Sequence, residues 1–194
     1  ELPHTLKLVE YSDVDPVSIC IGRAWGTPYL DNPEFPIDLL ASSIAKFHLA
    51  TFNISTEQVA TCKVWNHKSH ERQCLCHYDN QPRNILYDGL QYTFIDFSDS
   101  RFDFPETDVS HLLLFWAHEY GISTFTSHCL SFIHDYMQLL KLDATLWHEC
   151  LEHSILRFDE RRKKYCKQAP IQPLGVINQN RIFLFNLFSE SSTP

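Results

Sequence analysis

The sequence has no apolar run long enough to cross a membrane. The run Leu112-Leu-Leu-Phe-Trp-Ala117 is far shorter than the roughly 20 residues that a spanning helix needs. The start of the chain shows no signal peptide, and its first residue is Glu1 rather than methionine. We therefore expect no membrane partner, and the first residue suits a processed product or a fragment.

Positive charge is also scarce. The chain carries 16 Lys and Arg residues against 24 Asp and Glu residues, which gives a net charge of −8. Binding nucleic acid through phosphate contacts requires a basic surface, so we expect no nucleic-acid partner. The one basic run, 161–164, follows Asp159-Glu160, and this spacing predicts a solvated helix end. An anion contact is the alternative interpretation of the run.

A disulfide framework is the third absence. The seven cysteines are odd in number and lack the spacing of a small disulfide-linked domain. We therefore expect free thiols in a reducing compartment, and hence a cytoplasmic protein. A zinc-binding module is the weakest alternative, because the spacing is CxC rather than CxxC and no second pair follows. Its ligands would be Cys62, His67, His70, Cys74 and Cys76.

The length of 194 residues and the hydrophobic fraction of 44% suit a globular protein with one core or two small lobes. Alternating and β-branched residues predict strands over residues 5–11 and 17–22. A glycine and two prolines within residues 25–33 predict a hinge loop. From Pro36 the apolar residues recur at helical spacing, which predicts a helix. Its apolar positions are Ile37, Leu40, Ile44 and Phe47.

The second half of the chain is predicted to be mainly helical. Residues 84–97 predict a hairpin with Asp88-Gly89 at its turn. The apolar stretch 181–188 must pack against the core, but it is too short to distinguish a strand from a helix. Helices are expected over residues 108–120, 124–141 and 143–166, after a short strand or loop over residues 73–78. The expected fold class is therefore α+β.

Three oxygen-bearing side chains gather around the predicted hairpin. Asn84 begins one strand and Asp96 ends its antiparallel partner, so both lie near the same end of the hairpin. Asp79 lies on the loop that leads into it. Carboxylate and amide oxygens are ligands that suit Mg²⁺, and a further carboxylate can accept a proton from a hydroxyl. The alternative is that these are ordinary turn and cap residues.

This segment resembles the catalytic loop of the protein-kinase-like fold, H-x-D-x-x-x-x-N followed by D-F-x. Here it is written His77-Tyr-Asp79-Asn-Gln-Pro-Arg-Asn84 and, later, Asp96-Phe-Ser. It most resembles the aminoglycoside phosphotransferase and choline kinase group, whose loop has a proline at the position of Pro82. Residues 25–30 and 44–49 resemble the hinge and a helix of that group. The resemblance implies a protein-kinase-like fold, mostly its helical C-terminal lobe, with a catalytic hairpin and a reduced N-terminal strand region.

The resemblance also implies a role for each motif residue. Asp79 would be the catalytic base, Asn84 and Asp96 would hold Mg²⁺ on ATP, and His77 would brace the loop. The supporting residues would be Arg83, Asp99 and Asp108. The alternatives are that Asp108 is a helix N-cap, that Asp99 is a turn residue and that Arg83 lies in solvent.

The chain departs from that group before the hinge. No glycine-rich loop precedes residue 22, and Lys7 is the only lysine there. A bulky Tyr78 stands where the group has a small residue. We therefore expect residues 1–30 to be the remnant of a strand-rich lobe plus the hinge, and residues 31–194 to be the helical lobe. Part of a longer enzyme, a compact phosphotransferase and a degenerate relative all remain possible at this point.

The expected function is an ATP- and Mg²⁺-dependent transfer of phosphate to a hydroxyl of a small molecule. A non-catalytic binding module is the alternative. Acidic and aromatic residues of the later helices would line the acceptor pocket and would suit a cationic acceptor such as an amino sugar or choline. These residues are Trp116, Glu119, Tyr120, Trp147 and Glu149; the alternative is that they are core aromatics and solvated acids.

Overall fold

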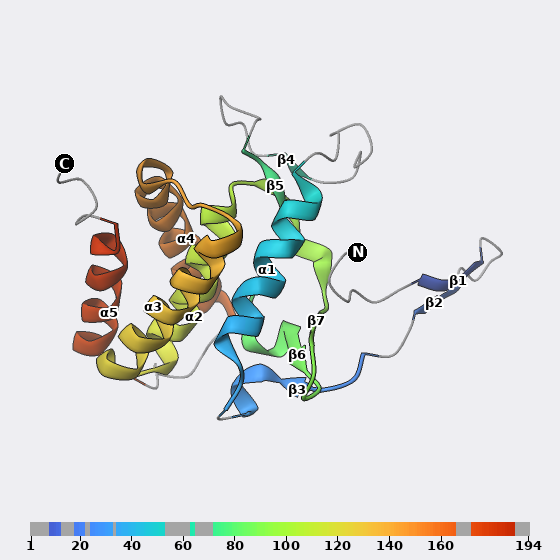
Figure 1. Cartoon of the computed structure of the whole chain (residues 1–194), viewed down its shortest axis with the longest axis horizontal. Helices are drawn as coiled ribbons and strands as arrows, with labels where there is room; N and C mark the ends of the chain where they lie inside the picture. Colours follow the sequence, from blue (N-terminus) through green and yellow to red (C-terminus); the bar gives the residue numbers. More distant parts are fainter. Residues whose placement is uncertain are drawn as a thin grey trace.

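The computed structural model describes residues 8–12, 18–21, 24–32, 34–52, 63–64, 72–165 and 172–188. Within these ranges the protein is α+β, with a helical body and small sheets at its edge (Figure 1). No helix in the described ranges is long and apolar enough to span a membrane.

Helices make up most of the body. Helix α1 packs on α3, and α2 packs on α4, while α5 covers α2 and α3 from the outside (Figure 1). The helix predicted from Pro36 is confirmed, and the stretch 181–188 proves to be the end of a helix. The bounds are α1 Ile37–Thr51, α2 Pro105–Glu119, α3 Ile122–Leu139, α4 Ala144–Tyr165 and α5 Leu174–Asn186.

The strands form three small sheets. Strands β1 and β2 pair as an antiparallel hairpin that lies apart from the helices (Figure 1). The second sheet has the order β3-β6-β7, and the third has the order β4-β8-β5. The bounds are β1 Leu8–Ser12, β2 Ser18–Ile21, β3 Thr27–Pro28, β4 Lys63–Val64, β5 Cys74–Cys76, β6 Ile85–Tyr87, β7 Tyr92–Phe94 and β8 Arg101–Asp103.

The predicted hairpin is confirmed as β6 and β7, which pair from Ile85 with Phe94 to Tyr87 with Tyr92. The side chain of Asp88 accepts hydrogen bonds from two backbone N–H groups of the loop, and Gly89 has a φ of +97°. The predicted hinge loop also contains β3, which extends this sheet. Gly26 precedes β3 with a φ of +116°, and a Cβ there would lie 2.6 Å from the carbonyl oxygen of Tyr87. Only glycine therefore lets the hinge approach the hairpin this closely.

One hydrophobic core joins the helices to the hairpin. It contains the apolar faces of α1, α2 and α3 together with Ile85 and Phe94 of the hairpin. The hinge contributes Tyr29, which is fully buried and accepts a hydrogen bond from Trp116 of α2. The loop that carries the motif residues is thus fixed between a packed helical body and the hairpin.

Candidate functional site

His77 is held from both sides by the backbone. Its Nε2 lies 2.8 Å from the carbonyl oxygen of Ile95, and its Nδ1 lies 3.3 Å from the backbone nitrogen of Asp79. The neutral tautomer with its proton on Nε2 satisfies both contacts, since Nε2 then donates and Nδ1 accepts. The ring is buried and packs against Phe97. His77 therefore ties the loop before β6 to the end of β7.

Asp108 anchors the same loop from α2. Its carboxylate accepts hydrogen bonds from the backbone N–H groups of His77 and Tyr78, at 3.0 and 2.7 Å, and from Nε2 of His48 at 3.0 Å. Burial alone would raise the pKa of this carboxyl, but the contact with His48 and the other donors lower it well below its usual range. Asp108 lies inside the first turn of α2, whose N-cap is Phe104. It therefore holds another segment and does not cap its own helix.

Tyr78 occupies a left-handed conformation, with a φ of +66°. Glycine would adopt this conformation more easily than tyrosine does. The ring of Tyr78 is buried, and its hydroxyl lies 3.4 Å from Nδ1 of His153 on α4. Burial raises the pKa of Tyr78 to about 12. The bulky side chain packs toward α4.

Asp79 and Asn84 lie in direct contact. The Nδ2 of Asn84 donates to Oδ2 of Asp79 at 3.0 Å and to its backbone carbonyl at 3.1 Å. Because Nδ2 binds Asp79, the amide oxygen of Asn84 is the atom that can bind a metal ion. Gln81 also donates to Oδ2 of Asp79, at 2.8 Å. The proposed base is therefore fixed by two side-chain amides of its own loop.

Asp96 lies at the same end of the hairpin. The backbone nitrogen of Ile95 donates to the carbonyl of Asn84 at 3.0 Å, which brings the next residue, Asp96, beside the loop. Asp96 is exposed and left-handed, with a φ of +59°. Hydrogen bonds from the side chain and backbone of Ser98 lower its pKa, so the carboxyl is ionised at neutral pH. An exposed carboxylate and a nearby amide oxygen fit a hydrated divalent cation.

The remaining supporting residues lie around this group. Arg83 is exposed, and its charge contributes to the lowered pKa of Asp96. Asp99 is partly exposed, accepts a hydrogen bond from Arg157 of α4 at 3.2 Å and forms an ion pair with Arg161 of the same helix at 3.1 Å. Asp99 therefore links the segment after the hairpin to α4.

The two tryptophans of the expected acceptor pocket are core residues. Trp116 and Trp147 are both fully buried. The indole N–H of Trp116 donates to the Tyr29 hydroxyl at 2.7 Å, and that of Trp147 donates to the Leu184 carbonyl at 2.8 Å. Neither indole is open to a ligand.

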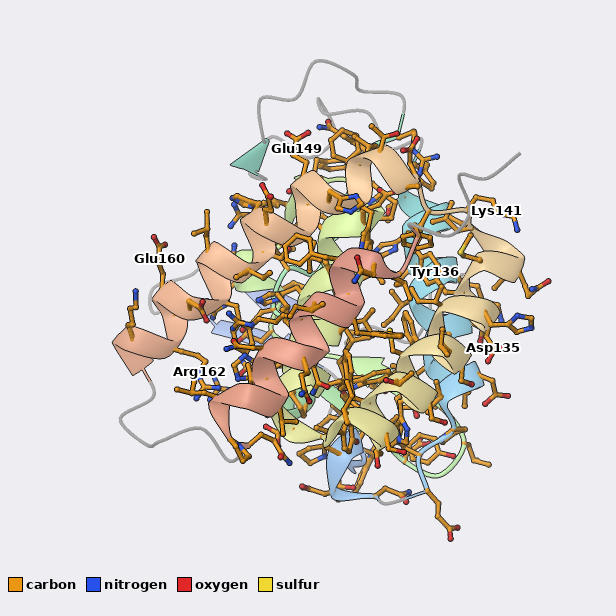
Figure 2. The ribbon with its side chains drawn as sticks, turned by 90° about the vertical axis from the view of Figure 1, so that its left-hand side faces the viewer. Asp135, Tyr136, Lys141, Glu149, Glu160 and Arg162 are labelled. Carbon is orange, nitrogen blue, oxygen red and sulfur yellow. The ribbon has the colours of Figure 1, made fainter. Side chains whose placement is uncertain are left out.

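Of the expected pocket residues, Trp116, Glu119 and Tyr120 lie together at the end of α2, whereas Glu149 lies apart from them. Glu149 is exposed near one end of α4, whereas Arg162 lies near the other end (Figure 2). Twelve residues separate Glu149 from Arg161, which is about 18 Å along a helix. Glu119 and Tyr120 lie at the end of α2, where burial raises the pKa of each.

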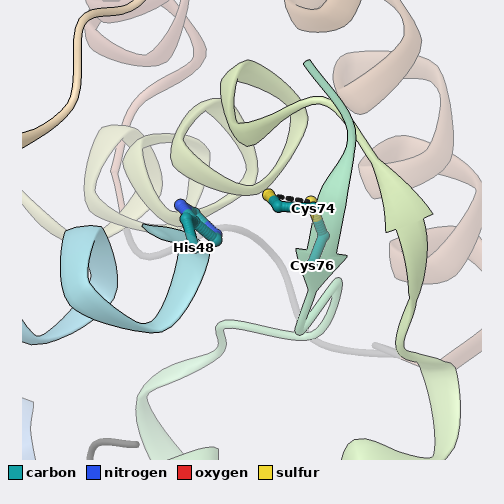
Figure 3. A group of neighbouring side chains, drawn as sticks. All are labelled: His48, Cys74 and Cys76. Atoms are coloured by element: carbon teal, nitrogen blue, oxygen red, sulfur yellow. Dashed lines mark hydrogen bonds between the residues drawn. The ribbon is translucent and has the colours of Figure 1, made fainter. Parts of the chain in front are cut away.

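Three side chains of types that can bind a metal ion lie together beside the start of the loop. One ligand atom each of His48, Cys74 and Cys76 lies within 4.8 Å of the others, and the two sulfur atoms are 3.9 Å apart (Figure 3). Both ring nitrogens of His48 are already used, by Asp108 and by the Tyr136 hydroxyl at 2.7 Å. Burial raises the pKa of both thiols. The group therefore fits a structural role in the packed core better than a zinc site. The other predicted ligands, Cys62, His67 and His70, lie outside the described residues.

Sequence reasoning missed the arginines that face the motif. Arg161 forms a bidentate pair with Asp79, so the prediction of a solvated helix end is wrong for this residue. Arg157 and Arg161 are four residues apart and share one helix face. This spacing was a usable signal, but nothing in the sequence showed that the face lies against the loop. His48, the partner of Asp108, was likewise not assigned.

Comparison with known proteins gives a family and a fold. Residues 40–150 match the model of the phosphotransferase enzyme family, which is more than half of the chain. No curated protein sequence matches significantly.

Three solved structures share the fold. Amicoumacin kinase hAmiN in complex with AMP-PNP, Ca²⁺ and Ami aligns with a TM-score of 0.59 and 13% identity, over 87% of this chain and 64% of that chain. The GDP complex of aminoglycoside 2'-phosphotransferase-IIIa aligns with a TM-score of 0.54 and 14% identity, over 98% and 77%. A choline/ethanolamine kinase family protein from Mesorhizobium loti aligns with a TM-score of 0.50 and 11% identity, over 98% of this chain and 75% of that chain. At these identities the likeness shows a protein-kinase-like fold and nothing beyond it.

Proposed function

The chain belongs to the phosphotransferase enzyme family, and on this premise we propose that it transfers a phosphoryl group from ATP to a hydroxyl of a small molecule. The observation that carries the proposal is the contact between Asp79 and Asn84 at the hairpin end that also bears Asp96. The proposal includes the division into residues 1–30 and 31–194 and a cytoplasmic location.

ATP and Mg²⁺ are the proposed cofactors. The amicoumacin kinase of the comparison was solved with AMP-PNP and Ca²⁺, a nucleotide analogue and a divalent cation. In this chain, the amide oxygen of Asn84 and the ionised carboxylate of Asp96 are the residues that would hold the cation. Bound magnesium supplies positive charge that offsets the charge developing on the transferred group.

The chain's own residues orient the reaction. Asp79 would accept the proton of the acceptor hydroxyl, because its carboxylate is fixed by Gln81 and Asn84. His77 accepts a hydrogen bond from the backbone N–H of Asp79, and Asp108 holds the backbone of the two residues before it. Fixing the base in advance removes the cost of ordering it during the reaction.

Phosphoryl transfer by the parent and by Asp79→Asn tests this proposal. Each protein is incubated with Mg·ATP and a panel of amino sugars, choline and hydroxy acids, and phosphorylated products are detected by mass spectrometry. Losing a general base costs on the order of 10²- to 10⁴-fold in rate, whereas Mg·ATP binding should change little. Asp31→Asn is the control, since Asp31 is exposed in the hinge segment. Equal activity of Asp79→Asn would rule out Asp79 as the base, and a parent that binds Mg·ATP but phosphorylates nothing would favour a non-catalytic module.

A further inference from the structure

Arg161 of α4 pairs with both carboxylate oxygens of Asp79. Its Nη1 lies 3.0 Å from Oδ1 of Asp79, and its Nη2 lies 3.2 Å from Oδ2. Oδ2 is also held by Gln81 and Asn84, so Oδ1 is the oxygen with fewer partners. A hydroxyl that delivers its proton to Oδ1 therefore lies beside the Nη1 group of Arg161 or replaces it.

A second carboxylate and a second guanidinium extend this contact. Arg161 also pairs with Asp99 at 3.1 Å, and Arg157 donates to the same oxygen at 3.2 Å. The side chains of Arg161 and Asp99 are 30% and 35% exposed, whereas that of Asp79 is only 7% exposed. A ligand from solvent thus meets the guanidinium of Arg161 before it meets the base.

Two arginines lie against the ring of Tyr78, the residue before Asp79. The guanidinium carbons of Arg101 and Arg157 lie 3.6 and 3.7 Å from the ring centroid of Tyr78. Two guanidinium groups cannot approach one centroid this closely on the same side, so they cover opposite faces of the ring. Burial lowers the pKa of Arg157 to about 10, and its neighbours Arg101 and Arg161 contribute to the decrease. Arg101, Arg157 and Arg161 therefore all lie beside the loop, where Asp103 is a further carboxylate near Tyr78.

We propose that the acceptor carries a carboxylate or phosphate group beside its reactive hydroxyl, and that Arg161 binds that anionic group when the hydroxyl replaces it on Asp79. The proposal rests on the proposed function, because it names the substrate class of the same site. A partly buried guanidinium that loses its carboxylate leaves N–H donors unsatisfied, and this costs binding energy. An anionic acceptor group supplies a bidentate partner in return, which arginine binds well.

A cationic acceptor does not suit this arrangement. An ammonium group beside the hydroxyl would lie close to Arg157 and Arg161, and juxtaposed like charges oppose binding. Glu149, an acidic residue that the sequence suggests for binding such a group, lies about 18 Å from Arg161 along α4. The carboxylates that do lie near Arg161, Asp79 and Asp99, are already paired with arginine.

The test measures charge preference on one carbon skeleton. The parent is loaded with Mg·AMP-PNP, which fills the place of the transferred phosphoryl group, and is titrated by calorimetry with glycerate, glycerol 3-phosphate, glycerol and 3-amino-1,2-propanediol. The variants are Arg161→Gln and Arg161→Lys. Arg162→Gln is the matched control, since Arg162 lies on the same helix but contacts His118 at 2.7 Å.

We expect the parent to bind at least one of the two anionic probes more tightly than glycerol and the amino alcohol. Arg161→Gln should weaken that binding about ten- to a hundredfold, as expected for the loss of a charge-assisted contact. The affinity of Arg161→Lys for the anionic probe should lie between those of the parent and of Arg161→Gln, because lysine keeps the positive charge but lacks the bidentate guanidinium group. Arg162→Gln should match the parent.

Three outcomes would overturn the proposal. The first is a loaded parent that shows no preference for the anionic probes. The second is a preference that survives in Arg161→Gln, which would leave Arg161 as a structural link between α4 and the loop. The third is a variant Arg161→Gln that binds AMP-PNP more weakly but binds ADP and the probes as the parent does. This result would assign Arg161 to the transferred phosphoryl group. Failure of the parent to bind Mg·AMP-PNP at all would instead contradict the proposed function.

Discussion

At the scale of single residues, Asp108 shows how one buried carboxylate can fix a loop. It is 1% exposed, yet it accepts two backbone N–H groups of the loop and the N–H of His48. His48 in turn contacts the Tyr136 hydroxyl of α3. Residues of α1, α2 and α3 therefore act together on the backbone that carries Asp79.

Asp108→Asn should destabilise the protein by about 2–4 kcal/mol, because a buried carboxylate with three donors is replaced by an amide. The folded-state pKa of Asp108 is depressed. The stabilisation is therefore complete above the unfolded pKa of about 4 and is lost as pH falls below it. Denaturant unfolding of parent and variant from pH 7 to pH 3 should show a difference in the free energy of unfolding that becomes smaller below pH 4.

Asp31→Asn is the control for that series, since an exposed acid should change the free energy of unfolding by less than about 0.5 kcal/mol. A constant difference between parent and Asp108→Asn across the whole pH range would contradict a depressed pKa for Asp108.

At the scale of elements, α2 connects the hinge to the loop. Asp108 at its start holds the loop, and Trp116, about two turns later, donates to the hinge residue Tyr29. Between them, Ser110 donates to Ser154 of α4 at 2.7 Å. One helix thereby positions the hinge, the loop and the arginine-bearing helix relative to one another.

Trp116→Phe should lower the free energy of unfolding by about 1–3 kcal/mol, because the buried Tyr29 hydroxyl loses its donor. KM for the acceptor that is phosphorylated fastest should stay unchanged, since the indole is not open to a ligand. Trp25→Phe is the matched control, because Trp25 is 65% exposed. If Trp116→Phe instead raised KM for the acceptor and left the free energy of unfolding unchanged, Trp116 would belong to the acceptor pocket.

The elements show where sequence periodicity was sufficient. The helix after Pro36 and the hairpin 84–97 were predicted because each has a clear period and a clear boundary signal. Helix α2 begins at Pro105, three residues before the predicted start, because a polar and fully buried first turn looks like a loop. Most of the stretch 181–188 belongs to α5, which ends at Asn186 and whose first half combines three apolar residues with Gly175 and three side-chain amides, a mixture without a clear helical period.

At the scale of the whole molecule, the candidate site draws on parts of the chain that lie far apart in sequence. The motif residues Asp79, Asn84 and Asp96 are local to one hairpin, and sequence spacing alone predicted that they converge. Arg161 comes from a helix whose position depends on packing against α2. Local patterns carry no information on such packing, so the charge around the acceptor could be inferred only from the structure.

Calorimetric titration with Mg·AMP-PNP, for the parent and for Asp96→Asn, tests the central claim most directly. We predict that the parent binds the nucleotide only with the divalent cation, and that Asp96→Asn binds at least about tenfold more weakly. The free energy of unfolding should change by less than about 0.5 kcal/mol, because Asp96 is exposed. Equal nucleotide binding by parent and variant, or equal binding by the parent with and without the cation, would contradict a metal–nucleotide site at Asn84 and Asp96.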